Sequence, residues 1–205
     1  MVPVLVGAEP IEGNPEYARE IAAEGMVLLE NDGALPLQPG AKVAVFGINQ
    51  LDYVRGGGGS GKTNIPSGSE WNLISGLGAK DAEGKIEVYQ PLVSFYQQAY
   101  DAGSRNANEP AVSGEEMQAA KDFAQTAIVT FGRYSSEGSD RSSGKGDYML
   151  SDSEQALIDQ VVAAGFENVV VLFTVGGIID STWFKGNDDI SGVLMAWQGG
   201  MRGGL

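Results

Sequence analysis

The chain has 205 residues, of which 42% are hydrophobic and 20% charged, and its formal net charge is −14. It contains neither cysteine nor histidine, which excludes disulfides, thiolate metal sites, a thiol nucleophile and the most common general base. The negative charge disfavours nucleic acid as a partner. Because no apolar run is long enough to cross a membrane, we predict a soluble globular protein. We expect no metal and no cofactor.

The first 40 residues are predicted to be a lead-in segment with one helix and a connector. The terminus Met1–Gly7 has no basic region and is too short for a secretory signal, so we expect a cytoplasmic location. Asn14 is a suitable N-cap and Pro15 a suitable first helical residue. Apolar residues then recur at helical spacing, which predicts a helix ending near Asn31. The turn-rich residues 35–40 cannot continue it.

Residues 41–205 read as one α/β domain. Short apolar runs bounded by turn signals predict five strands, at 42–47, 86–89, 127–131, 169–173 and 192–197. Capping boxes at Ser113 with Glu116 and at Ser151 with Glu154 predict two of the helices between them. Strands that alternate with helices favour a mainly parallel sheet flanked by helices on both faces, a fold that we expect to be incomplete at its C-terminal end.

The glycine-rich residues 56–63 satisfy the pattern of a phosphate-binding P-loop, G-x-x-x-x-G-K-[ST]. A P-loop leaves its strand directly and opens a helix, whereas residues 48–55 separate these glycines from the predicted strand and a turn-like segment follows them. We therefore treat nucleotide binding as a remote alternative. A flexible loop, or a backbone that approaches a ligand closely, is the better interpretation.

Glu137 is the leading catalytic candidate. It lies just beyond the predicted strand 127–131, and ligands of open α/β sheets collect outside the carboxyl ends of the strands. On position alone a solvated loop charge is the favoured interpretation, because loop carboxylates are mostly exposed and not functional. Asp140 and Arg141 follow on the same loop, and for this pair we favour a structural role.

Several segments together resemble the α/β sandwich domain of family 3 glycoside hydrolases. They occur in the order of that family and run from about residue 15 to the end of the chain. The segments are 22–31, 34–37, 42–47, the glycine loop that ends at 59–61 with Asn64 behind it, 136–141, 146–151 and 196–204.

The resemblance implies a retaining β-glycosidase, most simply a β-glucosidase. In such enzymes two carboxylates about 5–5.5 Å apart serve as nucleophile and as acid/base. The resemblance gives Glu137 the acid/base role and places the nucleophile, an Asp, on a separate (β/α)8 barrel that no segment of this chain resembles. Gly59 and Ser60 are implied to line the sugar site, although Lys62 and Thr63 depart from the usual family loop.

The order of the segments implies a member of the family in which the sandwich precedes the barrel. We expect the chain to be one piece of a longer polypeptide and to be inactive by itself. The partners implied are a β-glucoside or related oligosaccharide and the barrel domain; a homo-oligomer stays open. The alternative function is a non-catalytic module that binds carbohydrate or pairs with another domain.

Overall fold

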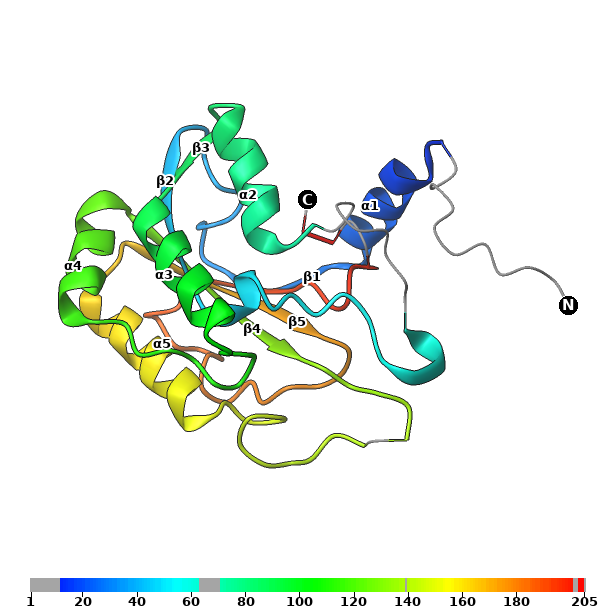
Figure 1. The fold of residues 1–205 in the computed structure, drawn as a ribbon. Helices are drawn as coiled ribbons and strands as arrows, with labels where there is room; N and C mark the ends of the chain where they lie inside the picture. Colours follow the sequence, from blue (N-terminus) through cyan, green and yellow to red (C-terminus); the bar gives the residue numbers. More distant parts are fainter. Residues whose placement is uncertain (1–11, 63–70, 139, 201–202, 205) are drawn as a thin grey trace, which may run out of the picture.

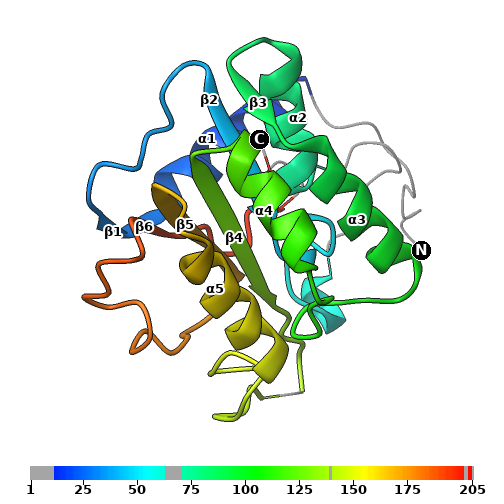
Figure 2. The ribbon, with the colours of Figure 1, turned by 90° about the vertical axis from the view of Figure 1, so that its left-hand side faces the viewer.

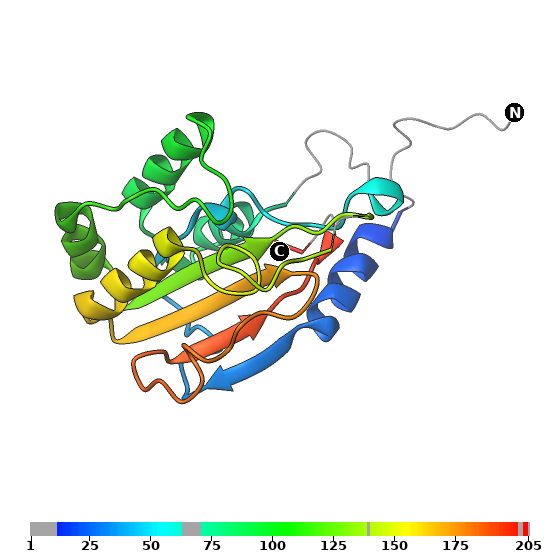
Figure 3. The same ribbon diagram turned by 90° about the horizontal axis from the view of Figure 1, so that it is seen from below.

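The computed structural model describes residues 12–62, 71–138, 140–200 and 203–204. Its centre is a six-stranded sheet in the order β1-β6-β5-β4-β2-β3 (Figures 1 and 3). Five strands run parallel, and β1 pairs antiparallel with β6. This confirms the predicted fold class. The strands are β1 (Val27–Asn31), β2 (Ala41–Phe46), β3 (Ile86–Val88), β4 (Thr126–Arg133), β5 (Asn168–Val175) and β6 (Gly192–Met195).

Helices cover both faces of the sheet. On one face, which is turned toward the viewer in Figure 2, α3, α4 and α5 pack on alternate strand residues such as Phe46, Phe131 and Phe173. On the other face, α2 packs on Val43 and Val45. The helices are α1 (Asn14–Gly25), α2 (Leu73–Ala82), α3 (Gln90–Asp101), α4 (Gly114–Phe123) and α5 (Asp152–Ala164), with the short 3-10 turns η1 (Ile48–Gln50) and η2 (Gly59–Gly61).

Of the predicted helix caps, the capping box at Ser151 is confirmed, the one at Ser113 forms only through the serine side chain, and the cap at Asn14 is wrong. Ser151 and Glu154 form a reciprocal capping box at the start of α5, and the Ser113 side chain caps α4 by accepting a hydrogen bond from the Glu116 amide. At α1 the N-cap is Gly13, which has the left-handed φ of 84°, and Asn14 is already helical.

The predicted helix up to Asn31 is also wrong in its second half. The helix α1 ends at Gly25, and residues 27–31 form β1, which extends the sheet beyond β6. The helical spacing of apolar residues was misleading because pairing with β6 decides the conformation of this segment, a long-range effect that overrides local preference. The sheet therefore includes part of the segment that the sequence assigned to the lead-in.

The apolar residues of α1 and β1 are largely exposed. None of the residues of α1 is buried, and Tyr17, Val27 and Leu28 retain 64%, 42% and 50% of their accessible surface. Among the described residues, no helix combines the length and the apolar character needed to cross a bilayer.

Candidate functional site

The strand order creates a switch point between β2 and β4. From β2 the chain moves outward to β3, and then crosses to the opposite side of β2 to form β4. Both strands end at the same edge of the sheet because they are parallel. Loops that leave such neighbouring strands in opposite directions open a crevice, which is where ligands of open α/β sheets bind. The loops at this point carry Ser60, after β2, and Glu137, after β4.

These two loops meet in the structure. The Glu137 carboxylate atom Oε2 accepts a hydrogen bond of 2.9 Å from the Ser60 amide and another of 2.7 Å from the Ser60 hydroxyl. The two residues are 77 positions apart in the chain, yet the turn η2 and the loop after β4 lie side by side in Figures 1 and 3. The structure thus brings together Glu137, Gly59 and Ser60, the three residues singled out in the sequence.

Glycine is required where the two loops touch. A Cβ atom on Gly59 would lie 2.7 Å from the Glu137 Cβ and 2.8 Å from its Oε2, and Gly59 has a φ of +65°. A Cβ on Gly58 would collide with the Tyr134 hydroxyl, and the Gly58 amide donates to the Ser135 carbonyl at 3.2 Å. The glycine run is therefore a surface against which the loop after β4 packs.

Contact with Ser60 lowers the pKa of Glu137. The largest cause is the hydrogen bond from the Ser60 amide and the second is the one from its hydroxyl, while partial desolvation acts in the opposite direction. Both donors favour the charged carboxylate. In this chain Glu137 is consequently held as an anion, a state suited to accepting a proton.

Replacing Gly59 by alanine is expected to separate the two loops. The added methyl group would displace Glu137 from Ser60, so the pKa of Glu137 should rise toward its ordinary value. The measurement is a pH titration of the glutamate side-chain carboxyl carbons by NMR. Gly138→Ala is the matched control, because Gly138 also has a left-handed φ, +77°, but open space around its Cβ position. A depressed pKa that persists in Gly59→Ala would contradict the expectation.

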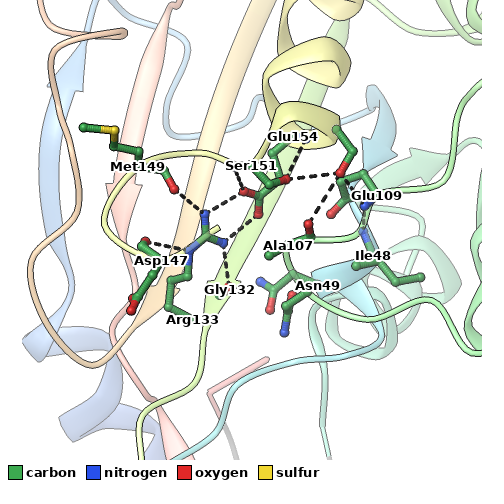
Figure 4. A network of polar contacts seen from close by, with 12 residues as sticks. Ile48, Asn49, Ala107, Glu109, Gly132, Arg133, Asp147, Met149, Ser151 and Glu154 are labelled. Atoms are coloured by element: carbon green, nitrogen blue, oxygen red, sulfur yellow. Dashed lines mark hydrogen bonds and ion pairs between the residues drawn. The ribbon is translucent and has the colours of Figure 1, made fainter. Parts of the chain in front are cut away.

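Arg133, the last residue of β4, anchors the loop that carries Glu137 (Figure 4). This loop, called here the Glu137 loop, comprises residues 134–138 and 140–149. The Arg133 side chain is only 3% exposed, and its two terminal nitrogens each lie 2.6 Å from an oxygen of Glu154. Glu154 is fully buried and also accepts a hydrogen bond from the Ser151 amide, so a single carboxylate binds Arg133 and caps α5.

Arg141 ties the same loop to the loop that follows β5. Its Nε donates to the Asp147 carboxylate at 2.5 Å, and its Nη1 donates to the Ile178 carbonyl at 2.6 Å. Desolvation is the largest single influence on the pKa of Asp147 and raises it, but the hydrogen bonds from Arg141 and from the Ser142 amide together lower the pKa by more. Beside this tie the two loops line a cavity of 410 Å³ that includes Tyr148 and Gly177. The structural role expected of Asp140 thus belongs to Asp147, because Arg141 pairs with the latter.

The glycine run lacks the structural context of a P-loop. The strand β2 ends at Phe46, and the turn η1 lies between it and Gly56. The next ordered turn, η2, is a single 3-10 turn that ends before Lys62, a residue exposed to solvent. Thr63 lies outside the described residues. Within the described part of the chain, no three acidic residues gather as metal ligands would.

The sequence did not indicate the partner of Arg133. Glu154 was identified only as a capping residue, and the pairing of two buried charges from different elements has no local pattern. The one available signal was the position of Arg133 at a strand end, four residues before Glu137.

Comparison with known proteins gives a consistent result. Residues 26–205 match the glycosyl hydrolase family 3 C-terminal domain. The chain is 38% identical to beta-glucosidase A of Butyrivibrio fibrisolvens, with 93% of this chain and 26% of that protein aligned. It is 39% identical to a beta-glucosidase of Ruminococcus albus, with coverages of 92% and 20%. The solved beta-glucosidase of Paenibacillus barengoltzii superposes with a TM-score of 0.85 at 36% identity and coverages of 96% and 22%. The chain spans between 20% and 26% of the length of these relatives.

Proposed function

This chain belongs to the C-terminal domain family of the family 3 glycosyl hydrolases, and we propose that it supplies the general acid/base, Glu137, of a retaining β-glucosidase-like enzyme. The observation that carries the proposal is the contact of Glu137 with the glycine loop at the switch point of the sheet. A carboxylate at this position is exposed to an incoming ligand and yet fixed by two hydrogen bonds. The substrate class is a β-glucoside or a related oligosaccharide with a terminal β-linked sugar.

The proposed reaction uses two carboxylates, of which this chain provides one. In the first step, an Asp on a barrel domain attacks the anomeric carbon while Glu137 gives its proton to the departing oxygen. In the second step, the Glu137 carboxylate takes a proton from water, whose oxygen attacks the anomeric carbon and releases the Asp. Neither step needs histidine or cysteine, both of which are absent from the sequence.

The pKa of Glu137 fits the second step directly. The two hydrogen bonds from Ser60 favour the anion, which is the form that accepts a proton from water. The first step needs the protonated acid. A negatively charged nucleophile nearby and burial beneath the sugar both raise a carboxyl pKa, so we propose that docking of the barrel and binding of substrate reverse the shift.

Formation of a glycosyl azide tests the role of Glu137. The protein required is the polypeptide that joins this chain to the barrel domain, carrying Glu137→Ala and supplied with an activated aryl β-glucoside. Azide needs no general base, so it should intercept the covalent intermediate and give β-glucosyl azide, identified by NMR. Asp140→Ala, which removes a neighbouring exposed carboxylate, is the control and should yield glucose alone.

An unchanged hydrolysis rate in Glu137→Ala, with no azide adduct, would remove Glu137 from the mechanism. That outcome would favour the non-catalytic interpretation, in which the same surface binds sugar or another domain. Isothermal titration of the unmodified chain with glucose and with β-glucosides would then measure any binding directly.

A further inference from the structure

The Arg133 side chain lies at the start of the Glu137 loop and makes hydrogen bonds to the end of the same loop. A guanidinium has five N–H donors, and in Arg133 all five are used (Figure 4). Two donate to Glu154, and one donates to the carbonyl of Gly132 within β4. The remaining two donate to the carbonyls of Asp147 and Met149, at 2.8 and 3.3 Å.

These contacts close the loop on itself. The chain leaves the sheet at Arg133, carries Glu137 four residues later, and returns to the Arg133 side chain at Asp147 and Met149 before α5 begins. Because Glu154 belongs to the first turn of α5, the base of the loop is tied to a helix and a strand at once. Arg141 adds a second tie within the loop by donating to the Asp147 carboxylate and to its carbonyl.

The strand ends beneath the candidate site are also held together by hydrogen bonds. Asn49, which is fully buried after β2, donates to the Thr130 hydroxyl of β4 at 2.7 Å and accepts from the Thr174 hydroxyl of β5 at 2.9 Å. A Cβ on Gly132 would lie 2.2 Å from the Asn49 Oδ1 atom. The strand ends that carry both halves of the site are therefore locked in register, and the remaining freedom of Glu137 lies in its loop.

We propose that Arg133 is a positioning residue that holds the Glu137 loop in the geometry needed for proton transfer, acting through its hydrogen bonds to the two returning carbonyls. This inference rests on the proposed function of Glu137. Its physical basis is that proton transfer requires heavy atoms within hydrogen-bond reach, and that displacements of about 1 Å can cost on the order of 100-fold in rate. The buried ion pair with Glu154 holds the Arg133 side chain in one position, which the exposed loop could not do by itself.

Arg133→Lys is the informative substitution. Lysine keeps the positive charge for Glu154 but has three donors on one nitrogen, so it cannot reach the carboxylate and both carbonyls together. In the complete polypeptide we expect kcat for an alkyl β-glucoside to fall about 10- to 100-fold, with KM changed less than about threefold. An aryl glucoside whose leaving group needs no proton should lose much less.

A double-mutant cycle separates positioning from general destabilisation. In a Glu137→Ala background there is no acid left to position, so adding Arg133→Lys should lower kcat by less than about threefold. Arg105→Lys is the matched control: Arg105 also donates to two carbonyls, those of Tyr100 and Ser104, but at the end of α3. All assays are run well below the thermal midpoint, which circular dichroism gives for each variant.

The outcomes distinguish the two proposals. If Glu137→Ala shows no dependence on the leaving group, both proposals are overturned. If Glu137→Ala shows that dependence but Arg133→Lys alone leaves kcat unchanged, or lowers it equally in both backgrounds, only positioning is overturned. Should Arg133→Lys fail to fold, Glu154→Gln replaces it in the same cycle. That change keeps a side-chain acceptor beside the Arg133 guanidinium but removes the charge that fixes it.

Discussion

In a polypeptide that joins this chain to the proposed barrel domain, Glu137→Ala is expected to lower kcat/KM for an alkyl β-glucoside by about 10²- to 10⁴-fold. That range is what a positioned general acid contributes. An alkoxide leaves poorly unless it is protonated as the bond breaks, whereas dinitrophenolate leaves without help. For dinitrophenyl β-glucoside we therefore expect kcat/KM to stay within about tenfold of the wild-type value, since this ratio reports the first irreversible step.

The measurement is a plot of log kcat/KM against the pKa of the leaving group for a series of aryl and alkyl β-glucosides. The plot should be much steeper for Glu137→Ala than for the wild-type enzyme. Asp140→Ala, an exposed carboxylate on the same loop, should reproduce the wild-type slope. Equal slopes for Glu137→Ala and the wild type would show that another group protonates the leaving oxygen.

Glu109→Gln is expected to stabilise the folded chain at alkaline pH. Glu109 is 8% exposed, and burial raises its pKa from 4.5 to about 8. The amide of Ile48, which donates to its Oε2 at 2.8 Å, and the nearby Arg133 lower the pKa, but burial outweighs them, and Glu154 and Asp52 add repulsion. The other oxygen, Oε1, is buried and accepts no hydrogen bond from the described residues.

The sign of the pH dependence follows from the direction of this shift. Between pH 4.5 and 8 the folded state keeps a proton on Glu109 that the unfolded state releases, so the free energy of unfolding falls as the pH rises. Each pKa unit corresponds to about 1.4 kcal/mol, so the loss is roughly 3–5 kcal/mol by pH 8. Glutamine cannot ionise and still offers an oxygen to the Ile48 amide. The variant should match the wild type near pH 5 and exceed its stability progressively above that.

Urea unfolding at several pH values from 5 to 9 measures this difference. Glu167→Gln is the control, because Glu167 is an exposed glutamate, and its substitution should change the free energy of unfolding by less than about 0.5 kcal/mol at any pH. Parallel pH profiles for Glu109→Gln and the wild type would mean that Glu109 ionises with an ordinary pKa in the folded chain.

The sequence predicted the inner parallel strands well because β2, β4, β5 and β6 are short apolar runs that are largely buried on both faces, a pattern visible in the local sequence. Val43, Val45 and Phe46 are all fully buried, as a run without polar alternation indicates. The strand β1 has no such local pattern. Its apolar residues are exposed and its pairing with β6 is antiparallel, so nothing local distinguished it from a continuation of α1.

The candidate site was predicted only in part, because some of its contacts join elements that are far apart in the sequence. The resemblance identified Glu137 and Ser60, and the structure places these two residues in contact. The residues that hold the Glu137 loop in place, however, could not be identified from the sequence. The five bonds of Arg133 and the raised pKa of Glu109 depend on burial and on partners from other elements. Such contacts follow from the packed fold, whereas capping residues such as Ser151 act within one turn and can be read locally.

The crossing of the chain between β2 and β4 builds the candidate site from residues that are far apart in the sequence. Ser60 and Glu137 meet only when these two strands are side by side, and the chain between the strands contains α2, β3, α3 and α4. No short piece of the chain contains both residues. On the proposed role of Glu137, intermediates in which β2 and β4 are not yet paired lack the assembled site, so in the polypeptide that carries a barrel domain the gain of turnover during refolding would report this pairing.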